Sequence, residues 1–465
     1  MAVTALAKPL TERPTGDTDS CSLIIFDRSG SQVAVLCHDG CRTLPEINLP
    51  CYSRKVEQIN AWVFRNCGIT TVSLFSWPIS AESHGHYYFA LEALPCCNEV
   101  PGLEWRHISE VASLLPAEQM VVVHSCHAQL DTSSKDPGER PFERIGWIHA
   151  LHDWVRRTVR VDRVISTAHL GGSHETCLIR FEVPEKTLWY KAVGRATPRE
   201  FVNVMALSKW LPQYLPAVLA SDRDRSAWLM ESGGATTLGE QPDFDTWLMV
   251  ARQLGDFQKN SISHTCEFLE LGCVDLRTEA LVDLIEPYFA SMDMLMRQQT
   301  KEVPEALTTS QLKQLAQGLD RTLNEVATLD LPDAIGNSDF NPGNILISSS
   351  GAKFIDWQVG HVGSPVLTLE YLIAHFAKMC PERSTQKHLL REAYFRAWQS
   401  AVPAQIMRKA LEVGPLIAVY ASAIASNTWR TPDRLAIPRI AGYQRSLVRI
   451  MHREALMLSE RGLLA

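Results

Sequence analysis

Residues 337–357 read NSDFNPGNILISSSGAKFIDW, and the interpretation of the whole chain starts from this stretch. Two apolar runs flank a Ser/Gly turn, which predicts a β-hairpin with polar residues at both ends. Those polar residues are Asp339, then Asn344 five positions later, then Asp356 twelve positions after Asn344. Two carboxylates and a carboxamide oxygen suit Mg²⁺, which takes few protein ligands together with phosphate oxygens. The spacing matches a phosphoryl-transfer pattern, in which a catalytic Asp precedes an Asn and an Asp that hold metal.

The hairpin resembles the aminoglycoside phosphotransferase and choline kinase-like family, whose usual motif is His-Gly-Asp-Leu-His-Pro-Gly-Asn followed by Ile-Asp-Trp or Ile-Asp-Phe. Pro342 and Gly343 stand between Asp339 and Asn344, as they do in the family. The resemblance implies a protein-kinase-like fold in which Asp339 is the catalytic base. It also implies that Asn344 and Asp356 bind Mg²⁺.

The match to the family motif has three departures. Asn337 and Ser338 stand where the family has His-Gly, and Thr368 stands where a structural Asp often follows. These departures leave open whether the site is catalytically active. An alternative interpretation is a turn-rich hairpin whose polar residues only cap its ends.

Length, charge and hydropathy restrict the class of protein. The chain has 465 residues, which predicts two or three domains. A net charge of −7 without any Lys/Arg run argues against a nucleic-acid partner. The first twenty residues contain no apolar core of a secretory signal, and no apolar run is long enough to span a bilayer. We therefore expect a cytoplasmic protein without a membrane partner, and the sequence leaves its oligomeric state open.

The pattern of elements predicts an α+β multidomain protein, with a Nudix-like α/β/α domain followed by a bilobal protein-kinase-like domain. The expected segments are an N-terminal tail at 1–20, the Nudix-like domain at 21–130, a linker and docking helix at 131–160, the kinase-like N-lobe at 161–232, and a helical C-lobe at 233–465 that contains the catalytic hairpin 335–358.

Residues 21–130 resemble a Nudix domain in fold but not in chemistry. Leu44-Pro45 and Gly68 stand at the spacing of the family's turn and its following strand. Where the family has metal-binding glutamates on the helix between them, this chain has Trp62 and Arg65. Neither an indole nor a guanidinium can bind Mg²⁺, which requires oxygen ligands. We expect a domain without hydrolase activity, used for packing, binding or regulation.

Residues 161–193 predict three strands, with a turn at 169–174. Gly171, Gly172 and Ser173 in that turn would let backbone N–H groups approach phosphate oxygens, although a Gly-Gly pair is also common in ordinary hairpins. Lys191 lies in the third strand, and Glu200 is the only acid in the following helix. The resemblance implies that these two residues pair and that Lys191 contacts the α- and β-phosphates of ATP. Glu200 could also simply favour a helix N-terminus.

The strand at 227–231 leads into Ser232, and the chain becomes helical from about residue 244. In the family this strand connects the two lobes, and its backbone recognises adenine. The resemblance therefore places Met230 and Ser232 at the nucleotide. The helices after the hairpin, including one expected at 416–427, would build the acceptor pocket.

Together these features imply an ATP- and Mg²⁺-dependent phosphotransferase that acts on a hydroxyl group of a small molecule. The alternative is a weakly active or inactive nucleotide-binding pseudokinase, because the Nudix-like domain lacks its acids and residues 337–338 depart from the family. Trp62 and Arg65 argue against a Nudix hydrolase. The identity of the phosphate acceptor stays open.

Overall fold

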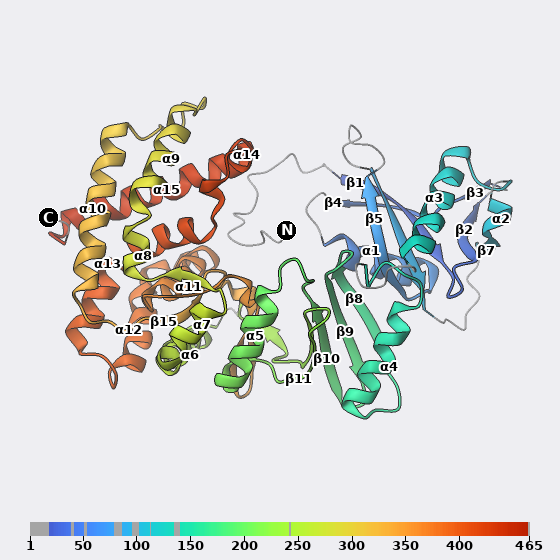
Figure 1. Ribbon diagram of the computed structural model, residues 1–465, viewed down its shortest axis with the longest axis horizontal. Coiled ribbons are helices and arrows are strands. Elements are labelled where there is room, and N and C mark those ends of the chain that lie inside the picture. Colours follow the sequence, from blue (N-terminus) through green and yellow to red (C-terminus); the bar gives the residue numbers. More distant parts are fainter. Residues whose placement is uncertain are drawn as a thin grey trace. The chain divides into compact units, whose positions relative to one another are not determined.

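The computed structural model describes residues 18–38, 41–50, 54–78, 86–94, 102–111, 113–133, 140–240 and 243–463, and its architecture is mixed α+β. The chain forms two compact units (Figure 1). The N-terminal unit comprises 18–201 and 217–232, and the C-terminal unit comprises 202–216 and 233–463. Residues 1–17 of the expected tail at 1–20 lie outside the described residues, and residues 18–20 begin a strand. No helix in the described ranges is both long and apolar enough to cross a membrane.

The N-terminal unit contains two sheets and their helices. Its elements are β1 (Thr18–Phe26), β2 (Gln32–His38), β3 (Cys41–Thr43), β4 (Glu46–Pro50), α1 (Lys55–Cys67), β5 (Thr71–Pro78), β6 (His86–Ala93), β7 (Leu103–His107), α2 (Ile108–Val111), α3 (Ala117–Ser133), α4 (Trp147–Val159), β8 (Ser166–Gly172), β9 (Cys177–Val183), β10 (Lys186–Ala192), β11 (Val218–Asp222) and β12 (Ala227–Glu231). Helix α5 (Arg199–Trp210) begins in this unit and continues into the other.

The first sheet is covered by helices on both faces. Its strand order is β3-β2-β1-β6-β5, with β4 paired to β1 and β7 paired to β2. Alternate residues of a strand point to opposite faces. Leu23 and Ile25 of β1 therefore share a core with Ile59 of α1, whereas Ile24 and Phe26 share the core that includes α3. This layering is the one expected for residues 21–130, and the Nudix-like identity stays a prediction.

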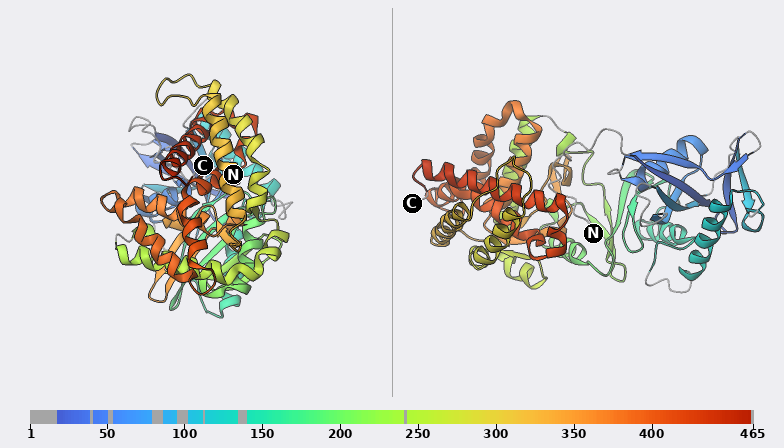
Figure 2. Two further views of the ribbon diagram at one scale, coloured as in Figure 1. Left: turned by 90° about the vertical axis from the view of Figure 1, so that its left-hand side faces the viewer. Right: turned by 90° about the horizontal axis from the view of Figure 1, so that it is seen from above.

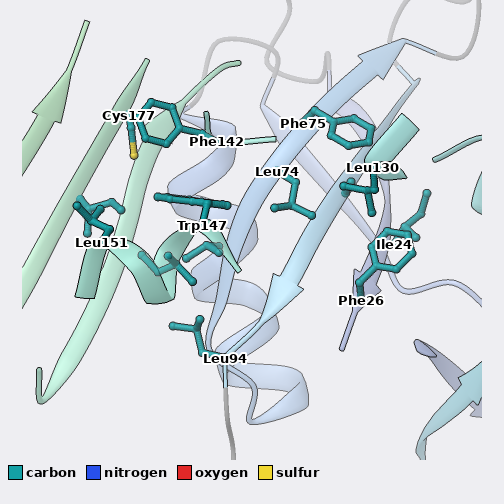
Figure 3. Packing of buried hydrophobic residues seen from close by; sticks show 14 of the residues in the cluster. Ile24, Phe26, Leu74, Phe75, Leu94, Leu130, Phe142, Trp147, Leu151 and Cys177 are labelled. Carbon is teal, nitrogen blue, oxygen red and sulfur yellow. The ribbon is translucent and has the colours of Figure 1, made fainter. Parts of the chain in front are cut away.

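Helix α4 joins the first sheet to the second. The second sheet has the order β11-β12-β10-β9-β8. Ile148, Leu151 and Val155 recur on one face of α4, and they belong to the buried cluster that contains residues of both sheets. Figure 3 shows Trp147 and Leu151 among the side chains of this shared core. The predicted linker and docking helix at 131–160 thus contains a helix that packs against both sheets, and residues 134–139 of the linker lie outside the described part.

The C-terminal unit is mainly helical, with small sheets around the hairpin. Its elements are β13 (Thr236–Thr237), α6 (Phe244–Ser261), α7 (Thr265–Glu270), β14 (Val274–Leu276), α8 (Thr278–Val282), α9 (Ile285–Arg297), α10 (Thr309–Ala327), β15 (Ala334–Asn337), β16 (Ile345–Ser348), β17 (Gly351–Phe354), β18 (Gly360–Gly363), α11 (Val366–Met379), α12 (Lys387–Trp398), α13 (Ala404–Ala425), α14 (Pro432–Leu435) and α15 (Pro438–Glu460).

Helices α9, α10, α13 and α15 share one apolar core, and their yellow-to-red ribbons lie together in Figures 1 and 2. Leu312, Leu315, Leu319 and Leu323 form the buried stripe of α10, at the spacing of one helix face. Thr308 begins α10 with a capping box, because its side chain accepts from the backbone of Gln311 while the Gln311 side chain accepts from the Thr308 backbone.

The helix expected at 416–427 starts twelve residues earlier than predicted, because α13 runs from Ala404 to Ala425 with Pro415 inside it. A proline in a helix interior removes one hydrogen bond and clashes with the preceding turn. Val413 and Leu416, on either side of this proline, are both buried. Burial of this apolar helix on both sides of the proline offsets the local cost of Pro415.

Candidate active site

The hairpin predicted at 335–358 is present in the C-terminal unit and is formed by β16 and β17. Asp339 follows β15 and precedes a 3₁₀ turn, Pro342–Asn344. Asn341 caps that turn, because its side chain accepts the Gly343 N–H at 2.9 Å. Pro342 at the first position of the turn has the backbone angle that such turns require. Local turn chemistry therefore fixes the short path from Asp339 to Asn344.

The Asp339 carboxyl is buried, with 6% of the residue exposed, and two donors reach the same oxygen. Asn341 Nδ2 donates to Oδ1 at 2.8 Å, and the Tyr371 hydroxyl of α11 donates to Oδ1 at 3.3 Å. A side-chain hydrogen bond from Asn344 also favours the ionised form of this carboxyl. Burial raises the pKa of Asp339 to about 6, the nearby charge of Asp356 raises it further, and the Asn341 hydrogen bond opposes both.

Asn337, the first departure from the family motif, connects the two acidic loops. Its Oδ1 accepts the backbone N–H of Asp339 at 2.9 Å, and its Nδ2 donates to the backbone carbonyl of Asp356 at 2.9 Å. Its own N–H donates to the Thr368 hydroxyl at 3.1 Å. Asn337 is fully buried, so each of these bonds replaces one to water. The Thr368 hydroxyl thus holds the backbone at 337, and the Asn337 side chain joins the loops of Asp339 and Asp356.

Ser338, the second departure, also has a partner. Its hydroxyl lies 3.0 Å from Nδ1 of His361, a residue of β18 that is only 2% exposed. Burial lowers the pKa of His361 to about 3, so this ring is neutral near pH 7. The unusual residues around Asp339 thus belong to a hydrogen-bonded network rather than to a loosened loop.

Asn344 and Asp356 offer oxygen atoms of the kind that Mg²⁺ prefers. Asn344 donates through Nδ2 to the Asp339 carbonyl at 3.0 Å, which leaves its Oδ1 as an acceptor. Asp356 has a φ of +62°, a left-handed backbone that is costly for a residue other than glycine and often occurs at functional positions. Within the described ranges, no group of three or more His, Cys, Asp or Glu side chains could hold a metal ion. A site made of one amide and one or two carboxylates fits Mg²⁺ that keeps its remaining positions for water and phosphate.

The predicted Lys191–Glu200 pair is present in the N-terminal unit. Lys191 lies in β10 and Glu200 in the first turn of α5, and their Nζ and Oε1 atoms are 2.5 Å apart. Glu200 is 3% exposed, whereas the Lys191 side chain keeps 24% of its surface accessible. Both interpretations of Glu200 therefore apply, since it pairs with Lys191 and begins a helix.

The predicted glycine turn differs from its expected bounds, because strand β8 continues through Gly172 and the reversal occurs at Ser173–Thr176. Ser173 closes this reversal, with its N–H donating to the Thr176 carbonyl at 2.9 Å. A Cβ on Gly172 would lie 2.9 Å from Nε2 of His169, so this position requires glycine. Gly172 thus accommodates a buried histidine, and whether Gly171, Gly172 and Ser173 contact phosphate stays a prediction.

His169 was missed by sequence reasoning, and it connects the glycine strand to the first sheet. Its Nδ1 accepts the Ser73 N–H of β5 at 3.0 Å, and Nε2 lies 3.0 Å from the Gly171 carbonyl. Asn60 of α1 donates to the His169 carbonyl at 3.0 Å. Burial lowers the pKa of His169 to about 4, which keeps the ring neutral, with one nitrogen accepting and the other donating.

Met230 and Ser232 lie at the end of β12, as expected for the strand that would hold adenine. Met230 pairs with Trp189 of β10, and the Ser232 N–H donates to the Thr187 carbonyl at 3.0 Å. This N–H therefore serves the sheet. Binding of a nucleotide by these two residues stays a prediction.

No protein-family model and no curated protein sequence matches this chain. The similar solved structures are choline kinases and aminoglycoside or macrolide phosphotransferases. A choline kinase from Cryptosporidium parvum is 12% identical to this chain, with a TM-score of 0.46. The match covers 68% of this chain and 98% of the kinase. A choline kinase from Streptococcus pneumoniae is 13% identical, covering 65% and 99%, with a TM-score of 0.39. A macrolide 2′-phosphotransferase from Brachybacterium faecium is 12% identical, covering 62% and 97%, with a TM-score of 0.41.

Proposed function

We propose that this protein is an ATP- and Mg²⁺-dependent phosphotransferase with a small-molecule hydroxyl as acceptor. The observation that carries the proposal is the Asp339 carboxyl, which is buried, oriented through Oδ1 by Asn341 and Tyr371, and has a pKa raised to about 6. A carboxyl with that pKa is ionised near pH 7 and is still basic enough to accept a proton.

In this proposal Asp339 positions the acceptor hydroxyl through Oδ2 and takes its proton. Asn344 Oδ1 and the Asp356 carboxylate hold Mg²⁺, while Lys191, kept in place by Glu200, contacts the α- and β-phosphates. Bound Mg·ATP supplies the transferable γ-phosphoryl group and the metal charge that stabilises it. The protein contributes mainly through positioning and charge, so each of these residues has a large effect.

The Asn337 network supports activity over the pseudokinase alternative. A site that had lost catalysis would not need to keep Asp339 and Asp356 joined through one buried side chain. The cost of burying Asn337 without partners would be roughly 1–3 kcal/mol for each missing bond.

The test is ATP turnover by the purified chain with Mg²⁺ against a panel of amino-alcohols, sugars and aminoglycosides. Asp339→Asn is measured beside Asp320→Asn, a change of the same type on α10. Transfer to one acceptor, lost in Asp339→Asn and kept in Asp320→Asn, would support the proposal. Binding of Mg·ATP without transfer to any acceptor would support the nucleotide-binding alternative instead.

A further inference from the structure

A cleft in the N-terminal unit lies beside α4 and the strands β10 and β11. It consists of two adjoining hollows of about 350 and 230 Å³, which share Arg144, Asp222 and Arg225. The larger hollow is lined mainly by charged residues, and the smaller one by aromatic residues, among them Trp147, Trp154 and Tyr190, together with charged and aliphatic ones. Small-molecule sites are typically apolar hollows with a few placed polar groups.

Two buried hydrogen-bond donors around this cleft have no acceptor among the described residues. The Nε atom of Arg144 and the indole N–H of Trp147 are both buried without a partner. Tyr190, which is 1% exposed, also lines the smaller hollow and carries a hydroxyl that can donate. Buried donors in native proteins are nearly always satisfied, by protein, water or a ligand, so two unpaired ones at one cleft leave room for acceptor atoms of a ligand.

The charges of the cleft point to the same kind of ligand. Arg225 pairs with Asp222 at 2.7 Å, and Arg195 donates to the Asp224 carbonyl at 2.7 Å. Glu175 accepts the Ala196 N–H at 3.4 Å. Arg144 differs from the other two arginines of the larger hollow, because it forms no ion pair or side-chain hydrogen bond with the residues that the structure describes. A guanidinium of this kind is suited to a bidentate contact with a carboxylate or a phosphate.

We infer that this cleft binds a small molecule that carries a carboxylate or phosphate on an aromatic body. The oxyanion would lie against Arg144, with the Tyr190 hydroxyl as a further donor, and the ring would pack against Trp154. Tyr190 and Lys191 are successive residues of β10, so their side chains point to opposite faces of the sheet. The site is thus distinct from the Lys191–Glu200 pair, and it does not depend on the proposed function.

The test is isothermal titration calorimetry of the full chain with phenyl phosphate, benzoate and uncharged benzyl alcohol, each with and without saturating Mg·ATP. We expect at least one of the two anions to bind, with ATP present or absent, and benzyl alcohol not to bind. The anion that binds identifies the oxyanion. No binding of either anion, or binding that ATP abolishes, would overturn the inference.

Variants locate the binding. Arg144→Gln should weaken the affinity about tenfold or more, and Tyr190→Phe should weaken it a few-fold, since each removes a donor to a charged group. Arg163→Gln, which changes an exposed arginine outside the cleft, should leave the affinity unchanged. Equal affinities in all three variants would overturn the inference. Tyr190→Phe removes only a hydroxyl, so it keeps the test valid if Arg144→Gln folds poorly.

Discussion

Two buried carboxyl groups, one in each unit, show how differently this chain uses the same chemical group. Asp339 and Glu92 are 6% and 0% exposed, and burial raises their pKa values to about 6 and about 7. Asp339 receives side-chain hydrogen bonds from Asn341, Tyr371 and Asn344. Glu92, in β6, accepts the Gly146 N–H at 2.9 Å, and Nε2 of His149 is 3.6 Å from its other oxygen.

The difference lies in what stabilises the charged form. The side-chain donors around Asp339 favour its ionised state, which suits a base. Glu92 has one backbone donor and lies where α4 packs on the first sheet, so it is best tolerated as a neutral acid. We therefore expect changes at Asp339 to affect turnover and changes at Glu92 to affect stability.

The largest expected effect comes from Asp339→Asn. The amide cannot take a proton, so turnover should fall by about 10²–10⁴-fold, as is typical for loss of a general base. The variant should be folded, because it keeps the shape of the side chain and removes a buried charge. Steady-state kinetics and a thermal melt measure the two effects, with Glu92→Gln as the matched control. If Glu92→Gln lost as much turnover as Asp339→Asn, the contrast between the two acids would be wrong.

Asn337→Ala should lower both the stability of the protein and its turnover. It removes the hydrogen bonds to the Asp339 N–H and to the Asp356 carbonyl, at a cost of roughly 4 kcal/mol in the free energy of unfolding. Turnover should fall as well, because both acidic loops lose their connection. Urea denaturation and kinetics measure these losses, and Asn324→Ala on α10 is the control. Unchanged turnover in a destabilised Asn337→Ala would show that the connection serves folding alone.

Sequence reasoning found the residues whose spacing along the chain is short and missed those that meet only in the fold. Asp339, Asn344 and Asp356 share one hairpin, and Lys191 and Glu200 are nine positions apart. Tyr371 reaches the same loop from α11, about thirty positions away, and no pattern in the sequence marks it. The family motif marked Thr368 as a departure, but not its bond to the backbone of Asn337. His169 contacts Ser73 across 96 positions. The departure at Asn337 was visible in the sequence, but its three hydrogen bonds depend on tertiary structure.

Fold prediction had the same limit. The sequence at 161–193 and 227–231 predicted strands of the second sheet, because the pattern that buries one face is local. The path of α13 through Pro415 was missed, since packing rather than local propensity maintains that helix. The contact of α4 with both sheets depends on its buried face, whose partners the sequence does not specify.

Glu92 should make the stability of the protein depend on pH. Its pKa in the folded state, about 7, is above the ordinary value of 4.5, so the unfolded chain ionises first as pH rises. The free energy of unfolding is then unaffected by this titration below pH 4.5, the ordinary pKa. It falls by about 3 kcal/mol between that pKa and the folded pKa of about 7, and it is lowest above about pH 7. Glu92→Gln has no such titration. Relative to the native protein, it should therefore be more stable at about pH 8 than at about pH 5.

Urea denaturation of both proteins at the two pH values measures this difference, and Glu110→Gln on the exposed face of α2 is the control. A difference in stability between Glu92→Gln and the native protein that did not change with pH would show that Glu92 is already ionised in the folded state. Glu92 would then resemble Asp339 rather than contrast with it.

Tyr371→Phe gives the smallest effect and the sharpest check on how Asp339 is tuned. The Tyr371 hydroxyl donates to Oδ1 of Asp339, and a bond of this kind favours the carboxylate over the neutral acid. Without it, the pKa of Asp339 should rise above about 6, by roughly half a unit to one unit. Activity that needs the ionised base is lost as pH falls through that pKa, so the acidic limb of kcat/KM should move to higher pH while the rate at high pH changes little. Tyr443→Phe, on α15, should leave the limb in place. A limb that stayed in place or moved to lower pH in Tyr371→Phe would mean that Tyr371 only packs beside Asp339. The Tyr371 hydrogen bond would then not be what separates Asp339 from Glu92.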